Sequence, residues 1–279
     1  MPFRKKCIFL LLPASAGFLL FYVIPFFGSL YYAGTKNTFD HSFVFLDNFI
    51  SSFQNEFFLL ALKNTLMFTV IGVGAIMVFS LVISILLVSA GKRYRFLRAA
   101  FVLPMLLPTA GVAQIWRSLF NSGNRLVSAQ SVLPGLLGEV FNPQILPVYL
   151  LYVWKYCGFN IILLVSAISS IEKEVYEAAA LDGASGLRLH WRITAPMIRP
   201  TLFFAAVLSF VNSFRIFKEI YYLFGDDYPP DPVYFVQYYM NNNFHKLNYQ
   251  MLSSGAIIFA SVIFVMVLFG YRSDAKKQR

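Results

Sequence analysis

The sequence predicts an all-α membrane protein with six transmembrane helices, and three observations support that class. First, 58% of its 279 residues are hydrophobic and only 13% are charged, whereas soluble domains usually contain about a quarter charged residues. Second, six apolar runs are each long enough to cross a bilayer, which takes roughly 20 residues. Third, basic residues concentrate in alternate connections between these runs. A surface so poor in charge suits lipid better than water.

The expected spans follow one another in a single domain that covers residues 1–279. They lie at about 7–32, 63–89, 99–119, 146–168, 201–223 and 251–271. The first run follows a basic start, as in a signal peptide, but it continues to about residue 32 without a clear cleavage site, which favours a retained helix. We expect the prolines within the spans to kink these helices rather than break them, because neighbouring helices can satisfy the freed backbone groups. These prolines are Pro13, Pro25, Pro104 and Pro108.

Lysine and arginine residues set the expected orientation. They cluster at 4–6, 92–98, 173–199 and 272–279, and with six spans these segments all fall on one side of the membrane. The opposite loops contain most of the Asp residues. The positive-inside rule therefore places both termini and the segment 171–200 in the cytoplasm. The formal net charge of +10 is explained by these topology signals, so nucleic-acid binding is not implied.

The cytoplasmic segment has the pattern of two short helices joined by a turn. Ser169 precedes Glu172 by three residues, which predicts a capping box at the start of the first helix. Gly183 is expected to end that helix in a left-handed conformation. A second helix can follow, and Pro200 suits the first turn of the fifth span. The apolar side of this elbow needs a cover, which is either the membrane surface or another protein.

The residues of this segment resemble a known motif. Glu177-Ala178-Ala179, then Asp182-Gly183-Ala184, then Ile193 and Pro196 are similar to the EAA loop of permeases in ATP-binding-cassette (ABC) importers. Beyond the loop, stretches such as "PMLLPTAGVAQIWRSLFN" and "WKYCGFNIILLVSAISSI" resemble the sugar-type permeases of binding-protein-dependent importers. Ala195 departs from the pattern, since the family usually has Leu before the proline.

The resemblance implies a function and a set of partners. The chain would be an inner-membrane permease subunit that forms the path for a sugar or related solute. Cytoplasmic ABC ATPase subunits would power it, an extracytoplasmic solute-binding protein would deliver the solute, and a second permease subunit, favoured to be a different chain, would complete the path. We call residues 171–200 the coupling segment. The residues that the resemblance assigns to ATPase coupling are Glu177, Ala178, Ala179, Asp182, Gly183, Ile193 and Pro196.

Polar and aromatic residues within the spans are candidates for the solute path. Aromatic faces and amides suit hydroxyl-rich solutes, but the same residues also serve as interfacial aromatics or as interhelical hydrogen-bonding groups. The candidates are Gln114, Trp154, Asn160, Asn212 and Ser213. Charged residues within or near the spans either pair, extend to the interface or line the path; these are Lys155, Arg215, Lys218 and Glu219. Arg215 and Glu219 stand four apart, which predicts a pair along one helix face.

Other classes of function find little support in the sequence. No GxxxxGK[ST] phosphate loop occurs, so the chain is not expected to hydrolyse ATP. No catalytic constellation, cofactor motif or metal-ligand spacing stands out. The main alternative is a stand-alone secondary transporter, which would favour inverted repeats and broken helices near the midplane. Association with an ATPase would distinguish the two.

Overall fold

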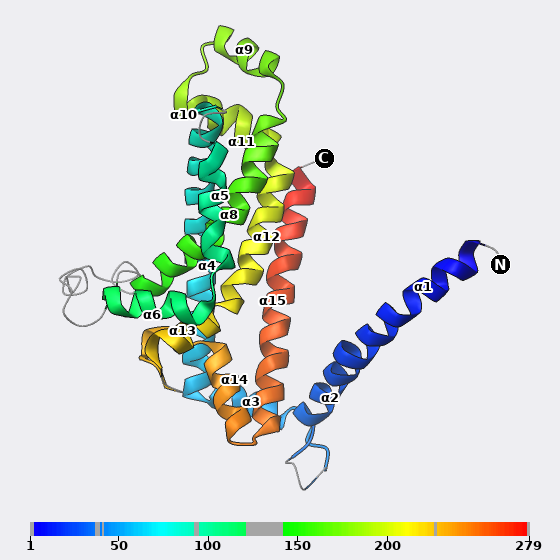
Figure 1. The fold of residues 1–279 in the computed structure, drawn as a ribbon. Helices are drawn as coiled ribbons and strands as arrows, with labels where there is room; N and C mark the ends of the chain where they lie inside the picture. The colour runs from blue at the N-terminus through cyan, green and yellow to red at the C-terminus, as the bar shows by residue number, and fades with distance from the viewer. Residues whose placement is uncertain are drawn as a thin grey trace. The chain divides into compact units, whose positions relative to one another are not determined.

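A computed structural model describes residues 3–36, 40, 42–91, 95–120, 142–225 and 228–277. Over these ranges the chain is helical (Figure 1) and contains no β-strand. One isolated antiparallel β-bridge joins Thr35 to Phe43. This confirms the predicted all-α membrane fold. The chain forms two compact units. The first contains residues 1–62 and 236–277, and the second contains residues 63–235.

Helices from both ends of the chain build the first unit, and helices from its middle build the second. The first unit contains α1 (Phe3–Phe18), the π-helix η1 (Leu19–Val23), α2 (Ile24–Ala33), α3 (Asp47–Gln54), the start of α4 (Glu56–Ser89), α14 (Val236–His245) and α15 (Tyr249–Lys277). The second contains the rest of α4, α5 (Arg95–Leu106), α6 (Thr109–Phe120), α8 (Leu146–Ser169), α9 (Lys173–Leu181), α10 (Gly186–Leu189), η3 (His190–Thr194), α11 (Ala195–Met197), α12 (Arg199–Arg215), α13 (Phe217–Phe224) and η4 (Asp231–Val233).

Five helical stretches among the described residues are long and apolar enough to cross a membrane. They are Leu11–Ala33, Glu56–Ser89, Leu146–Ser169, Arg199–Phe224 and Tyr249–Leu268. A sixth results if Phe96–Leu106 and Thr109–Phe120 count as one span, and these two helices meet at an angle of 96°. The expected third span, 99–119, falls on this bent pair.

The prolines behave in two ways. Pro13 and Pro104 lie inside helices, and Pro25 follows the π-helix Leu19–Val23, which widens the turn that faces the proline ring. At Pro108 the expected kink is instead a break between α5 and α6, so that expectation was wrong there. Pro104 and Pro108 together remove two backbone donors within five residues, which weakens the helix where it turns.

In the first unit, α15 packs against α2, α3 and α14. The contact with α3 is polar at its centre, where Ser52 Oγ and Ser254 Oγ lie 2.8 Å apart. At Gly255 an added Cβ would lie 3.2 Å from the Tyr239 ring and 3.3 Å from the Phe58 ring. The small residues Ser254 and Gly255 thus allow α15 to approach its neighbours closely, as is common in membrane helices.

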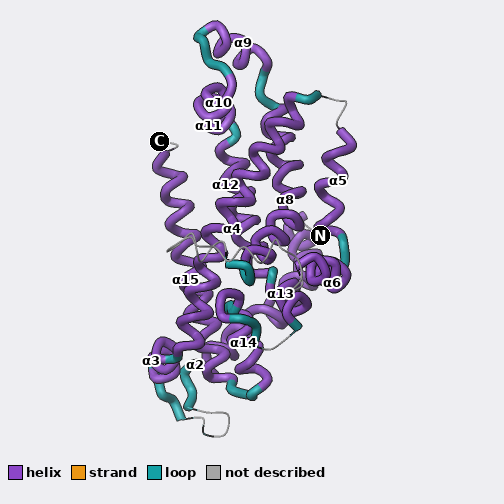
Figure 2. The backbone as a smooth tube through the Cα atoms, turned by 90° about the vertical axis from the view of Figure 1, so that its left-hand side faces the viewer, coloured by secondary structure: helices purple, strands orange, loops and turns teal. Residues whose placement is uncertain are grey.

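In the second unit, α8 packs against α5 and α12. At Gly158 an added Cβ would overlap the carbonyl oxygen of Phe101, so the backbones of α8 and α5 are in direct contact. Ser209 joins α12 to α8, because its carbonyl accepts a bond from Tyr152 Oη (2.5 Å) and its Oγ accepts one from Asn160 Nδ2 (2.7 Å). Figures 1 and 2 show α9 beyond one end of α8 and α12, with α13 at the other end of α12.

Candidate functional site

The coupling segment begins after α8 and projects as a helical elbow (Figure 2). Helix α9 ends in a Schellman motif, in which Ala184 N donates to Ala179 O (2.9 Å) and Gly183 N donates to Ala180 O (3.0 Å). Gly183 has φ +76°, in the left-handed region predicted from the sequence. No atom lies within 4 Å of the position that a Cβ of Gly183 would occupy. The turn therefore depends on backbone conformation and not on side-chain space within this chain.

The expected capping box at the start of α9 does not form. Ser169 is the last residue of α8, and the N-cap of α9 is Glu172, in an extended conformation and without a side-chain capping bond. The prediction failed because α8 continues to Ser169, carrying Ile168 into a buried apolar cluster. A residue that is still helical in α8 cannot cap the next helix.

The return half of the elbow is tied to α9 by Thr194. Its side chain is fully buried, and its Oγ1 lies 3.2 Å from both Tyr176 Oη and His190 Nδ1. Tyr176 belongs to α9 and Thr194 to η3, so this contact fixes the two arms to each other. Pro200 lies in the first turn of α12, as predicted.

The residues assigned to coupling divide between the surface and the interior of the elbow. Glu177, Ala178, Asp182 and Pro196 are exposed, Ile193 is half-buried and Ala179 is buried. Two large apolar side chains of the same elbow are also exposed, Leu181 at 91% and Trp191 at 78%. Sequence reasoning placed Trp191 on an apolar side that requires a cover, and in this chain that side chain is uncovered.

The base of the elbow is anchored in the helix bundle. Leu164 and Ile168 of α8 form a buried cluster with Ile198, which lies at the junction of α11 and α12. Leu81 and Ile85 of α4 pack against this cluster. Both ends of the coupling segment are thereby held by apolar contacts to α4, α8 and α12.

The five candidates for the solute path are not gathered in one site. Asn160 and Ser213 are buried and hydrogen-bonded, Asn160 to Ser209 and Ser213 to Thr69 (Oγ to Oγ1, 3.0 Å). Gln114 is exposed and Asn212 is half-buried. Trp154 is 39% exposed, and its ring centroid lies 5.8 Å from that of Trp116.

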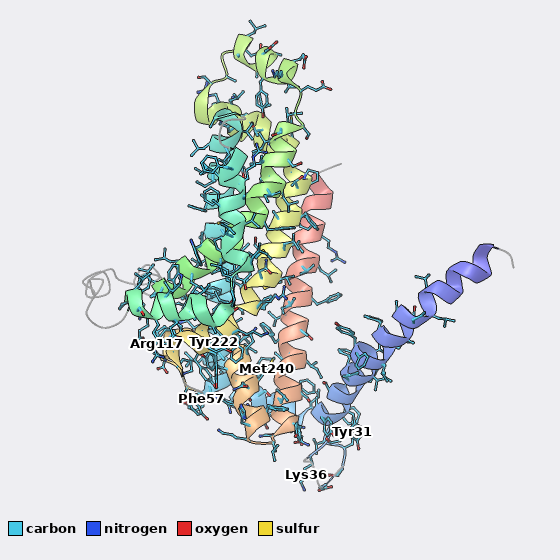
Figure 3. The ribbon with its side chains drawn as sticks, in the orientation of Figure 1. Tyr31, Lys36, Phe57, Arg117, Tyr222 and Met240 are labelled. Carbon is cyan, nitrogen blue, oxygen red and sulfur yellow. The ribbon has the colours of Figure 1, made fainter. Side chains whose placement is uncertain are left out.

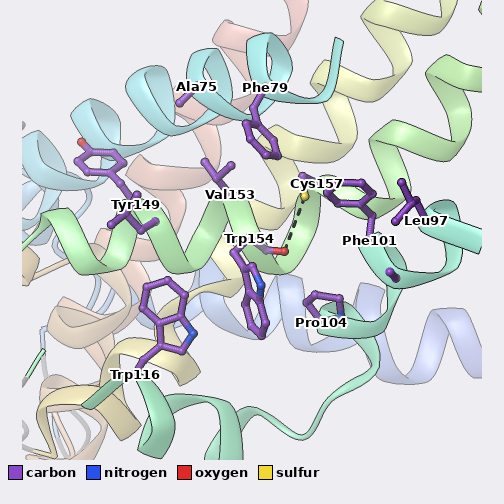
Figure 4. A pocket seen from close by; sticks show the side chains of 12 residues that line it. Ala75, Phe79, Leu97, Phe101, Pro104, Trp116, Tyr149, Val153, Trp154 and Cys157 are labelled. Atoms are coloured by element: carbon purple, nitrogen blue, oxygen red, sulfur yellow. Dashed lines mark hydrogen bonds between the residues drawn. The ribbon is translucent and has the colours of Figure 1, made fainter. Parts of the chain in front are cut away.

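A pocket of about 630 Å³ lies beside this tryptophan pair. Figure 4 shows Phe79 of α4, Phe101 and Pro104 of α5, and Trp154 and Cys157 of α8 around it. The lining is almost wholly apolar and lacks the convergent polar groups that orient a hydroxyl-rich solute. The pocket gives Trp154 apolar neighbours, and a role of Trp154 in the solute path stays a prediction.

Two of the charged residues near the spans form a buried ion pair, but sequence reasoning did not predict that these two are partners. Lys155 Nζ of α8 lies 2.6 Å from Glu219 Oε1 of α13, and both side chains are at most 5% exposed. Over the described residues, the ion pair of Glu219 is with Lys155 and not with Arg215 as expected. Helix α12 ends at Arg215 and α13 begins at Phe217, so the predicted partners do not share one helix face. The sequence signal was that Lys155 and Glu219 each lie within or near an apolar run, where a charge requires a partner or water.

Comparison with known proteins places these features in context. Residues 75–279 match the protein family described as "Binding-protein-dependent transport system inner membrane component". The chain is 30% identical over 211 residues to the sn-glycerol-3-phosphate transport system permease protein UgpA of Yersinia pestis bv. Antiqua (strain Antiqua), covering 74% of this chain and 72% of the relative. It is 26% identical to the probable ABC transporter permease protein YesP of Bacillus subtilis (strain 168), covering 92% and 87%.

Two solved structures are also similar. A chain of a bacterial ABC transporter involved in the import of the acidic polysaccharide alginate superposes with a TM-score of 0.79 at 23% identity, covering 98% of this chain and 96% of that one. A chain of the bacterial alginate ABC transporter in complex with alginate pentasaccharide-bound periplasmic protein gives a TM-score of 0.73 at 25% identity, covering 96% and 93%.

Proposed function

Since this chain belongs to the family of binding-protein-dependent transport system inner membrane components, we propose that it forms the translocation path of an ABC importer for a sugar or related solute. The observation that carries the proposal is the coupling segment, an anchored elbow that presents Leu181 and Trp191 uncovered. A rigid elbow with exposed apolar side chains on a multi-pass inner-membrane protein suits docking to a cytoplasmic partner. Family membership favours this role over a stand-alone secondary transporter.

The partner proposed for the elbow is an ABC ATPase subunit. Glu177 and Asp182 are exposed beside the apolar side chains, so the surface offers charged contacts around an apolar centre. The chain has no ATPase site of its own in this proposal, in keeping with a sequence that lacks a phosphate-binding loop. Movement of the docked ATPases would reach the bundle through the cluster of Leu164, Ile168 and Ile198.

The solute class is proposed from the relatives. One relative is named for sn-glycerol-3-phosphate and one structural neighbour for alginate, which share hydroxyl groups and negative charge. A solute-binding protein would deliver the solute at the outer loops, and a second permease subunit, a different chain, would complete the path. In this proposal both termini lie in the cytoplasm, and the support is the distribution of Lys and Arg along the sequence.

The outer loop of the first unit offers a surface for the binding protein. The bridge between Thr35 and Phe43 closes this loop, and Asn48 Nδ2 donates to the carbonyls of Ala33 (2.9 Å) and Thr35 (2.7 Å). Phe45 is 73% exposed beside Phe43, with a ring-centroid distance of 4.8 Å. Figure 3 shows Lys36 beyond the end of α2, where it pairs with Asp40 (3.4 Å). A braced loop with exposed aromatic and charged side chains suits protein recognition.

The proposal is tested by uptake and by association with an ATPase. The tagged full chain is purified from membranes of its host with the importer subunits co-expressed, and solute uptake is measured in vesicles. We expect uptake to require internal ATP and the binding protein. Trp191→Glu should weaken ATPase binding by about thirtyfold, corresponding to about 2 kcal/mol for an aromatic anchor. Leu247→Glu, which changes an exposed apolar side chain outside the elbow, is the control.

Two results would contradict the proposal. Uptake that survives ATP depletion but collapses with an ionophore would make the chain a secondary transporter. Labelling of Ser185→Cys in intact cells by an impermeant reagent, with Tyr228→Cys protected, would invert the proposed orientation.

A further inference from the structure

Lys155 of α8 contacts residues of two other helices, α6 and α13. Its Nζ donates to Thr109 Oγ1 (2.9 Å) and pairs with Glu219 Oε1 (2.6 Å). Thr109 is the first residue of α6, and Glu219 lies in the first turn of α13. Both helices are short: α6 follows the 96° bend at Leu107 and Pro108, and α13 follows α12 after one interrupting residue, Ile216, within a single apolar stretch. One ammonium group therefore joins two helix starts to the unbroken helix α8.

The helices before the bend and before the interruption are fixed to α8 by different contacts. Helix α5 is in backbone contact with α8 at Gly158. Helix α12 is bonded to α8 through Ser209, which accepts from Tyr152 and Asn160. Helices α6 and α13 pack against each other, and Figure 1 shows them side by side. A movement of α6 and α13 as a pair would therefore be centred on the bend at Pro108 and on the interruption at Ile216, and would leave the contacts of α5 and α12 with α8 in place.

The carboxylate of Glu219 is buried, and among the described residues only one of its two oxygens accepts hydrogen bonds. Lys155 Nζ and Tyr156 Oη (3.2 Å) both donate to Oε1. The other carboxylate oxygen, Oε2, is buried and accepts no hydrogen bond from the described residues. A buried ion pair can lose more hydration than its attraction restores, and an acceptor without a donor adds to that loss. Separation of the pair would let water reach both charges, which lowers the free-energy cost of opening.

We propose that Lys155 is a positioning residue and that its pair with Glu219 is a latch, which holds α6 and α13 against α8 at rest and opens during the transport cycle. The proposal rests on the importer function, because ATP-driven movement supplies the reason for the latch to open. It differs from a permanent structural contact in one respect: the distance between α6 and α8 must change with the state of the ATPase.

The test measures that distance in the assembled importer. Spin labels are placed at Ser118 on α6 and Phe159 on α8, both exposed, after Cys7→Ser and Cys157→Ala remove the native thiols. The matched control carries labels at Leu103 on α5 and Phe159 on α8. Double electron–electron resonance is recorded with and without ATP and the binding protein. We expect a second, longer-distance population for the Ser118 pair with ATP, and none for the Leu103 pair.

Variants of the pair sharpen the result. Glu219→Gln should raise the longer-distance population several-fold without ATP, and Lys155→Glu combined with Glu219→Lys should restore the closed distribution. If these variants do not accumulate in the membrane, the Ser118–Phe159 distance distributions of the parent protein with and without ATP still test the latch. Identical Ser118–Phe159 distributions during measured ATP-driven uptake would overturn the latch and leave the importer function intact. Absence of ATP-driven uptake would overturn the proposed function, and with it the reason for the latch to open.

Discussion

The coupling segment and the interior of α8 keep their shapes by different means. In the coupling segment, the turn after α9 is made by backbone hydrogen bonds within six residues and by a left-handed glycine, Gly183. Along α8, the positions of neighbouring helices are set by contacts between residues far apart in sequence, such as Gly158 with Phe101 and Asn160 with Ser209. The elbow exposes the apolar side chains of Leu181 and Trp191, whereas most residues of α8 are buried within the chain.

Because of this difference, Gly183 and Gly158 are required for different physical reasons. Gly183 is needed for its φ angle and has open space around it. Gly158 is helical and is needed for its lack of volume. Substitutions at the two positions should therefore fail for different reasons, one in coupling and the other in folding.

The largest effect is expected at Gly158. In Gly158→Ala the new Cβ would meet the carbonyl oxygen of Phe101, a backbone atom that cannot rotate away. Overpacking typically costs about 1–3 kcal/mol, and we expect the upper end together with a marked loss of folded protein in membranes. Gly74→Ala is the control, since no atom lies within 4 Å of its Cβ position and alanine favours a helix by roughly 0.5–1 kcal/mol. Thermal unfolding of the two purified variants compares them, and equal stability would show that α5 and α8 can separate.

The next effect is expected at Gly183. Gly183→Val should insert normally but couple poorly, because a β-branched residue at φ +76° carries strain of about 1–3 kcal/mol. Gly183→Asn should retain much of the activity, because asparagine tolerates the left-handed conformation. Uptake and ATPase co-purification are measured on both variants. If Asn fails as completely as Val, the partner needs the space beside Gly183 and the backbone conformation is not the deciding feature.

A smaller effect separates structural from solute-facing polar groups on α8. Asn160→Ala removes a buried bond to Ser209, and interhelical hydrogen bonds in membranes contribute about 0.6 kcal/mol on average. We expect a modest fall in thermal stability and an unchanged KM for uptake. Trp154→Ala, at an exposed position of the same helix, should show the reverse if that side chain faces the path. A raised KM in Asn160→Ala at unchanged stability would return Asn160 to the solute path.

The smallest effect is expected on the outer loop. Phe45 has φ +49° and an exposed ring, so Phe45→Asn removes the ring and relieves the backbone at once. We expect the concentration of binding protein that gives half-maximal ATPase activity to rise about fivefold, corresponding to about 1 kcal/mol. The maximal rate should be unchanged. A change in maximal rate at constant affinity would mean that this loop affects the transport steps and not docking.

Sequence reasoning predicted the features that depend on local backbone chemistry. Apolar runs and the positions of Lys and Arg predicted a helical membrane fold, and Gly183 and Pro200 were predicted in their observed conformations. The failures have two causes. The capping box at Ser169 and the pairing of Arg215 with Glu219 were inferred from neighbours in sequence, but they were decided by contacts with distant residues, Ile168 with Ile198 and Glu219 with Lys155. The break at Pro108 reflects the combined effect of two prolines within five residues, which were considered one at a time.

The Lys155–Glu219 pair has a consequence for how the protein is made. The two residues are 64 positions apart, and ribosomes add about 5–20 residues per second. Lys155 therefore emerges roughly 3–13 s before its partner carboxylate exists. During that interval α8 carries an unpaired ammonium near its middle, which is unfavourable in lipid. We therefore expect the final packing of α8 to be completed only after α13 has been made, when the carboxylate of Glu219 becomes available to Lys155.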